Sequence, residues 1–262
     1  MRTATMIKEN AKTFPLEEAR GLVKDLMTPS PTIYWIDFLF SITLAWSAFT
    51  LAVLSPYFSF EWWAGYIVSS LMLYRSVLFT HELAHFKKGT FKLFRLTWNI
   101  VCGCLLLVPS FTYNGVHNDH HKRDVYGTKD DGEYMPFGAQ NPLHIIGYMG
   151  LIFFLPFLFV LRFFILAPIS IIVPSLGRLT WQRLSSLTID LNYRRSLDQR
   201  DKLKTWRLQE LLAIIYCWSA VLLVIAGILP IKILAMWYLA SVLMFLLNSL
   251  RTLSAHAYTN PG

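Results

Sequence analysis

Long apolar segments dominate the hydrophobic pattern of this chain. Each is long enough to cross about 30 Å of hydrocarbon at about 1.5 Å per residue. The segments are 32–55, 61–80, 209–229 and 232–250. The linker between the first two is short and uncharged, and a tight turn at Pro230 joins the last two. The pattern therefore predicts two helical hairpins in a membrane.

The Lys and Arg residues set the expected orientation in the membrane. Residues 1–31 hold five of them, 81–142 hold seven and 175–208 hold eight, whereas the two hairpin turns hold only Lys232. The cytoplasmic segments of membrane proteins carry such an excess. We therefore expect these three basic segments, together with both termini, on the cytoplasmic side.

The apolar segment 143–174 is ambiguous, because it is too long for one crossing and too short for two. It also contains Pro156, Arg162 and Pro168. Since it connects two segments expected on the same side, it has to leave and return to one face, as a re-entrant or interfacial structure. The predicted fold class is an all-α integral membrane protein with four transmembrane helices plus re-entrant or interfacial helices.

Residues 1–31 are expected to form a separate amphipathic segment on the cytoplasmic side. Apolar side chains recur there at helical spacing, at Leu16, Ala19, Leu22, Val23, Leu26 and Met27. This spacing is typical of a short helix that lies on the membrane surface. The tract Thr28-Pro29-Ser30-Pro31 ends the segment, and a membrane domain over 32–262 follows.

The composition agrees with a membrane protein. The chain is 55% hydrophobic and 15% charged, against roughly 45–50% and 25% in soluble domains. This balance excludes a disordered protein, a coiled coil and a disulfide scaffold. The formal net charge is +8, but no run of Lys and Arg alternates with aromatic residues. Nucleic acid is therefore not an expected partner.

The candidate chemistry lies in the histidines, because five of the seven fall in two tight clusters. His81 and His85 stand one helical turn apart just past the second apolar segment, in the sequence HELAH. His117, His120 and His121 form the second cluster, HNDHH. Neutral imidazole binds zinc, copper, iron and nickel. Because a catalytic zinc takes about three protein ligands, five imidazoles predict two metal ions.

Other residues near these clusters extend the candidate site. His256 follows the last apolar segment and returns to the same predicted face, so it is a sixth candidate ligand. The acidic neighbours Glu82, Asp119 and Asp124 are candidate acceptors for the N–H groups of the metal ligands. His144 stands alone and is interpreted as a surface histidine.

With both histidine boxes and the apolar segments around them, the chain resembles the membrane fatty acid desaturase superfamily. The resemblance covers nearly the whole chain, and the tract from Gly115 to Tyr134 looks much like bacterial members. It implies a two-iron, non-haem site at the cytoplasmic mouth of an acyl-chain tunnel. There, molecular oxygen and two electrons remove two hydrogens from a lipid acyl chain. The implied iron ligands are His81, His85, His117, His120, His121 and His256.

The chain departs from this family at its end. A third histidine box should follow some tens of residues after His256, but the sequence stops at Gly262. We therefore expect a chain that is truncated before that box, short of metal ligands and inactive in this form. No haem or ferredoxin-like motif is present, so we expect a separate electron donor, ferredoxin-like or cytochrome-like.

Other functions compete with desaturation. A hydroxylase or a ketolase uses the same histidine boxes and differs only in its product. An intramembrane zinc metalloprotease would use HELAH as its HExxH motif, with Glu82 as general base. That function leaves the second histidine cluster without a role. A metal-binding or transport protein would need ionisable groups along its spans, and these are few: Asp37, Arg75 and Arg162.

Overall fold

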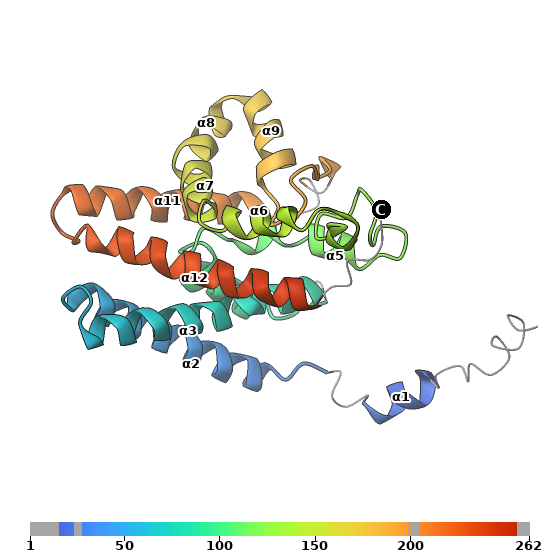
Figure 1. Ribbon diagram of the computed structural model, residues 1–262, viewed down its shortest axis with the longest axis horizontal. Helices are drawn as coiled ribbons and strands as arrows, with labels where there is room; N and C mark the ends of the chain where they lie inside the picture. Colours follow the sequence, from blue (N-terminus) through green and yellow to red (C-terminus); the bar gives the residue numbers. More distant parts are fainter. Residues whose placement is uncertain (1–15, 24–27, 88, 199, 201–204, 256–262) are drawn as a thin grey trace, which may run out of the picture. The chain divides into compact units, whose positions relative to one another are not determined.

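The computed structural model describes residues 16–23, 28–87, 89–198, 200 and 205–255. All regular structure within these ranges is helical (Figure 1). The all-α prediction is therefore confirmed for the described part of the chain. The chain divides into two compact units, residues 1–37 and residues 38–262, and each is described by itself.

The first unit contains α1 (Leu16–Leu22). Glu17 and Glu18 lie in its first turn, where carboxylates interact favourably with the helix dipole. Leu22 and Val23 are exposed. The expected helix is confirmed over this range, whereas Leu26 and Met27 lie outside the described residues. Its contact with a membrane surface stays a prediction.

The second unit is built on long helices that run in a common direction in Figure 1. They are α2 (Pro31–Leu54, of which residues 38–54 belong to this unit), α3 (Phe60–His85), α11 (Trp206–Ile225) and α12 (Lys232–Ala255). α3 packs against α12. It also lies close to α2, because a Cβ on Gly65 would be 2.7 Å from the carbonyl oxygen of Ala48. Small residues allow this kind of close approach between membrane helices.

Four helical stretches in the described residues are long and apolar enough to cross a membrane. They are α2, residues 155–172, α11 and α12. Three of them match expected spans, and the number agrees with the prediction. The expected span 61–80 lies within α3, which is 26 residues long but more polar, since it carries Arg75 and several buried hydroxyl groups. The role of α3 as a span, and the side of the membrane on which each end lies, stay predictions.

The ambiguous segment 143–174 is a chain of short helices. These are α6 (Leu143–Leu151), α7 (Leu155–Val160), the π-helix η4 (Leu161–Leu166) and α8 (Ala167–Ile172). Figure 1 shows α7 and α8 running across the direction of α11 and α12. α9 (Pro174–Leu184) then doubles back on α8, with Gly177 packed on the backbone of Ser170. The crosswise direction is compatible with the re-entrant or interfacial interpretation, although residues 155–172 qualify as a span by length and composition.

Short helices connect α3 to α6 and carry the second histidine cluster. They are α4 (Lys92–Trp98), the π-helix η1 (Asn99–Gly103), η2 (Ser110–Thr112), α5 (Val116–His120) and η3 (Phe137–Ala139). Side-chain amides hold the turn before α5. Asn99 Oδ1 accepts from the backbone N–H of Ser110 at 2.9 Å, and Gln209 Oε1 accepts from that of Phe111 at 2.9 Å. This turn is therefore fixed to η1 and to α11.

A buried ion pair connects η4 to α11. Nη2 of Arg162, a residue 4% exposed, lies 2.6 Å from Oε1 of Glu210, which is 2% exposed. Nε of Arg162 also donates to the carbonyl oxygen of Leu184, at the end of α9, at 3.1 Å. The guanidinium therefore fastens three helical segments at one point.

We expect Glu210→Gln to destabilise the folded protein strongly. The substitution leaves the buried charge of Arg162 without its partner, a change that costs about 3–5 kcal/mol. Arg207 serves as control, since it contacts the same carboxylate at 3.0 Å but its side chain is 41% exposed. Arg207→Gln should cost about 1 kcal/mol or less. The thermal unfolding midpoint in detergent measures both variants, and equal losses would contradict a stabilising role for the buried pair.

Candidate metal centre

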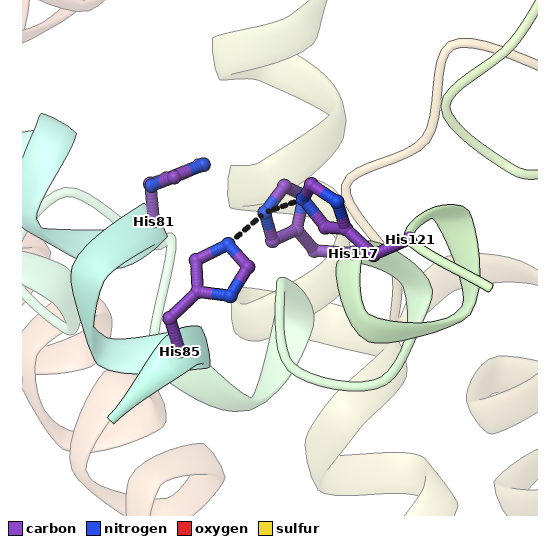
Figure 2. A group of neighbouring side chains, drawn as sticks. All are labelled: His81, His85, His117 and His121. Carbon is purple, nitrogen blue, oxygen red and sulfur yellow. Dashed lines mark hydrogen bonds between the residues drawn. The ribbon is translucent and has the colours of Figure 1, made fainter. Parts of the chain in front are cut away.

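Two helix ends bring the histidine boxes together. His81 and His85 lie in the last turn of α3, one above the other. His117 lies in the first turn of α5, and His121 follows its last residue. Gly115, directly before α5, has φ +97°, a conformation that side chains rarely adopt and glycine adopts readily. Figure 2 shows the four imidazoles facing a common point from these two elements.

The four imidazoles of His81, His85, His117 and His121 have the geometry of a metal site. Each offers one ring nitrogen, and these nitrogens all lie within 4.8 Å of one another. Nε2 of His117 is 3.0 Å from Nε2 of His85 and 3.1 Å from Nε2 of His121, the contacts dashed in Figure 2. Two nitrogens bound at right angles about 2.1 Å from one ion would be about 3.0 Å apart. The spacing therefore fits a shared metal ion.

Buried acceptors set the orientation of His117. Its Nδ1 lies 3.1 and 3.2 Å from the two carboxylate oxygens of Glu133 and 2.9 Å from the hydroxyl of Tyr113. The Tyr113 ring stacks on the imidazole, with ring centroids 4.5 Å apart. Since an ionised carboxylate only accepts hydrogen bonds, Nδ1 carries the proton. In the neutral imidazole, this tautomer leaves the lone pair of Nε2 facing the other imidazoles.

His120 is held by a second carboxylate beside this group. Its Nδ1 lies 2.9 Å from both oxygens of Asp131. Asp131 in turn accepts hydrogen bonds from the backbone N–H groups of Gly127 at 2.9 Å and Glu133 at 3.0 Å. His120 is not one of the four converging imidazoles. It lines, with His121, an open hollow of about 460 Å³ bounded further by Lys122, Arg123, Tyr126 and Ala255.

The surroundings change the proton affinity of these imidazoles in two directions. Burial lowers the pKa of His85, and the three neighbouring imidazoles lower it further. Burial and neighbouring imidazoles also lower the pKa of His121. Neutral imidazole is the form that binds metals. Burial acts downward on the pKa of His120 as well, but the hydrogen bond and charge of Asp131 outweigh it and raise that pKa.

The three acidic residues predicted to lie beside the histidines have different contacts in the structure. Glu82 Oε1 lies 3.2 Å from Nδ1 of His81, as expected for an acceptor. Asp119 forms an ion pair with Lys122 at 2.6 Å, and Asp124 is exposed, so their predicted role beside the histidines stays a prediction. His144 is exposed.

Sequence reasoning missed the carboxylates of Asp131 and Glu133, which contact His120 and His117. The alternation of acid, glycine and acid at 131–133 was the available signal. The candidate ligand His256 lies outside the described residues.

The fold and this cluster define a multi-pass membrane protein with a candidate histidine metal site. The chain belongs to the fatty acid desaturase family, whose model matches residues 60–262, a range that includes both histidine boxes. The resemblance seen in the sequence is therefore confirmed. A ceramide hydroxylase of Caulobacter vibrioides (strain NA1000 / CB15N) is 35% identical over 245 residues, which cover 94% of this chain and 69% of that protein. No solved structure matches.

We expect the carboxylates of Asp131 and Glu133 to support metal binding. Removing an acceptor that holds a ligating histidine costs about 10–100-fold in metal affinity. Asp131→Asn and Glu133→Gln should each weaken Fe²⁺ binding by this order, whereas the exposed neighbour provides a control, Asp130→Asn. Competition with a chelator in detergent measures the affinities. If all three variants bound Fe²⁺ like the wild type, the carboxylates would have no part in holding the site.

Proposed function

We propose that this protein oxidises a C–H bond of a lipid acyl chain in the membrane, using molecular oxygen and histidine-bound iron. The observation that carries the proposal is the convergence of four imidazoles from both boxes of a fatty acid desaturase family member. The protein then belongs to the membrane oxidoreductases of the desaturase and hydroxylase type. This enzyme class disfavours the metalloprotease and transport alternatives.

His81, His85, His117 and His121 would hold one iron ion. When bound, iron supplies redox chemistry for breaking an unactivated C–H bond, which zinc does not offer. The protein's own contribution is to orient the imidazoles. Glu133 and Tyr113 keep the proton of His117 on Nδ1, on the side away from the other three rings.

We further propose a second iron, with His120 among its ligands. A histidine whose Nδ1 is fixed by a carboxylate presents Nε2 to a metal, and Asp131 fixes His120 in this way. His256, outside the described residues, is a proposed further ligand. In this proposal, the acids expected from the sequence alone accept hydrogen bonds from the N–H groups of the metal ligands. These acids are Glu82, Asp119 and Asp124.

Hydroxylation is the reaction that we propose first. Its support is the ceramide hydroxylase that is 35% identical over 94% of this chain. Desaturation, which the sequence pattern favoured, is the second candidate and is supported by the family match. Both reactions consume one oxygen molecule and two electrons, which a separate ferredoxin-like or cytochrome-like partner would supply.

Product analysis tests the proposed function. The assay uses membranes that contain the full-length protein, including any residues encoded after Gly262. Supplied with Fe²⁺, a reduced ferredoxin, oxygen and ceramide, these membranes should yield a lipid with one added oxygen atom by mass spectrometry. A product that has lost two hydrogens would favour the second candidate. His117→Ala should abolish either product because it removes a central ligand, whereas the exposed His144 is the control, and His144→Ala should keep it. An unchanged lipid with iron-loaded wild-type protein would contradict the proposal.

A further inference from the structure

The loop after α9 contacts two segments beside the second histidine box. One is the turn before α5, and the other is the turn that carries Asp131 and Glu133. We call residues 185–195 the clamp segment. Its Leu187 donates a backbone hydrogen bond to the carbonyl oxygen of Thr112 at 2.8 Å, just before α5. Its Ile189 and Asp190 donate to the carbonyl oxygen of Gly132 at 2.8 and 3.2 Å. One loop therefore bonds to the turn before α5 and to the turn that carries the acceptors of His117 and His120.

A fully buried arginine ends the clamp segment. Arg195 is 0% exposed, and its Nη1 donates to the carbonyl oxygens of Phe111 at 2.7 Å and Ser185 at 2.6 Å. Its Nη2 donates to the carbonyl oxygen of Asn114. The guanidinium also lies 4.5 Å from the centroid of the Trp181 ring of α9. This planar fork spans carbonyl groups from separate segments, which the point charge of a lysine cannot do in the same way.

The acid turn is packed so tightly under the clamp segment that only glycine fits at its centre. A Cβ on Gly132 would lie 2.7 Å from Val116 of α5, 2.9 Å from Tyr193 and 3.0 Å from Thr188. Gly132 stands between Asp131 and Glu133, so an added side chain would displace both carboxylates from their imidazoles. The site and the clamp segment therefore share one packed interface.

We propose that the clamp segment positions the metal site, with Arg195 and Gly132 as its positioning residues. The inference rests on the proposed metal centre but concerns residues that touch neither metal nor substrate. Arg195 bonds to Asn114, the residue before Gly115, and Gly115 directly precedes α5, so this bond fixes where His117 lies. Gly132 fixes the distance between the carboxylates and α5. Metal affinity should therefore depend on contacts one layer beyond the carboxylates.

Cobalt binding by the purified, full chain in detergent tests this proposal without any turnover. The visible absorption of bound Co²⁺ reports both affinity and coordination geometry. Arg195→Gln and Arg195→Lys should shift the spectrum and weaken Co²⁺ binding at least about tenfold. A tenfold loss is the lower end of the effect seen when residues behind the metal ligands are replaced. The matched control is the adjacent, exposed Arg194, whose Arg194→Gln variant should bind as the wild type does. Folded Arg195 variants with wild-type affinity and spectrum would overturn the proposal.

Two further measurements decide the question if the Arg195 variants do not fold. Gly132→Ala should weaken Co²⁺ binding by a similar factor, and wild-type affinity in this variant would overturn the proposal. In the wild type, linkage requires that Co²⁺ stabilise the same contacts that favour its binding. The amides of Leu187 and Ile189 should therefore exchange hydrogen more slowly with Co²⁺ bound, and unchanged exchange would count equally against the clamp. A wild type that binds no Co²⁺ would instead refute the metal centre on which the proposed function rests.

Discussion

The convergence of four imidazole nitrogens is the constraint on which the rest of this structure depends. The surrounding protein has to hold the rings in place so that these nitrogens stay within 4.8 Å of one another. α3 does so for His81 and His85 by its length, since a helix of 26 residues needs no local help. α5 has only five residues, too few for a helix to be stable by itself. His117 and His121 therefore depend on bonds from outside their own helix.

Those bonds are arranged in layers around α5. Carboxylates of Asp131 and Glu133 fix the rings of His120 and His117. Backbone N–H groups fix Asp131 in turn, and the clamp segment fixes the turn that contains both acids. Asp131, Glu133 and Arg195 are buried, and at such positions a hydrogen bond is stronger and a missing partner costs more than in water. We therefore expect a loss in an outer layer to shift the four converging imidazole nitrogens.

Much of this could be predicted from the sequence, but not the layers around the site. The lengths of the apolar segments were sufficient to predict the helices. The spacing of the histidines was sufficient to predict that His81 and His85 approach His117 and His121. The acids were harder, because Asp119 and Asp124 are nearer to the second box in sequence than Asp131 is. Which acid reaches an imidazole depends on a turn that folds back over α5, and the tight packing of Gly132 is visible only in three dimensions. Helix α3 was expected as an ordinary span, yet its buried hydroxyl groups make it less apolar than residues 155–172.

The buried arginines of this protein bind backbone carbonyl oxygens rather than mark a path for ions. Ionisable residues within apolar segments usually mark a route for ions or substrate, and Arg162 was one of the few candidates for such a route. The structure instead pairs it with Glu210 at 2.6 Å and with a helix-end carbonyl. Arg195 likewise binds the carbonyl oxygens of Phe111, in the three-residue helix η2, and of Ser185, just after α9. A carbonyl that leaves a helix inside an apolar protein must find a donor, and arginine provides several in one plane. The irregular backbone that the second histidine box requires is stable here because such a donor lies buried beside it.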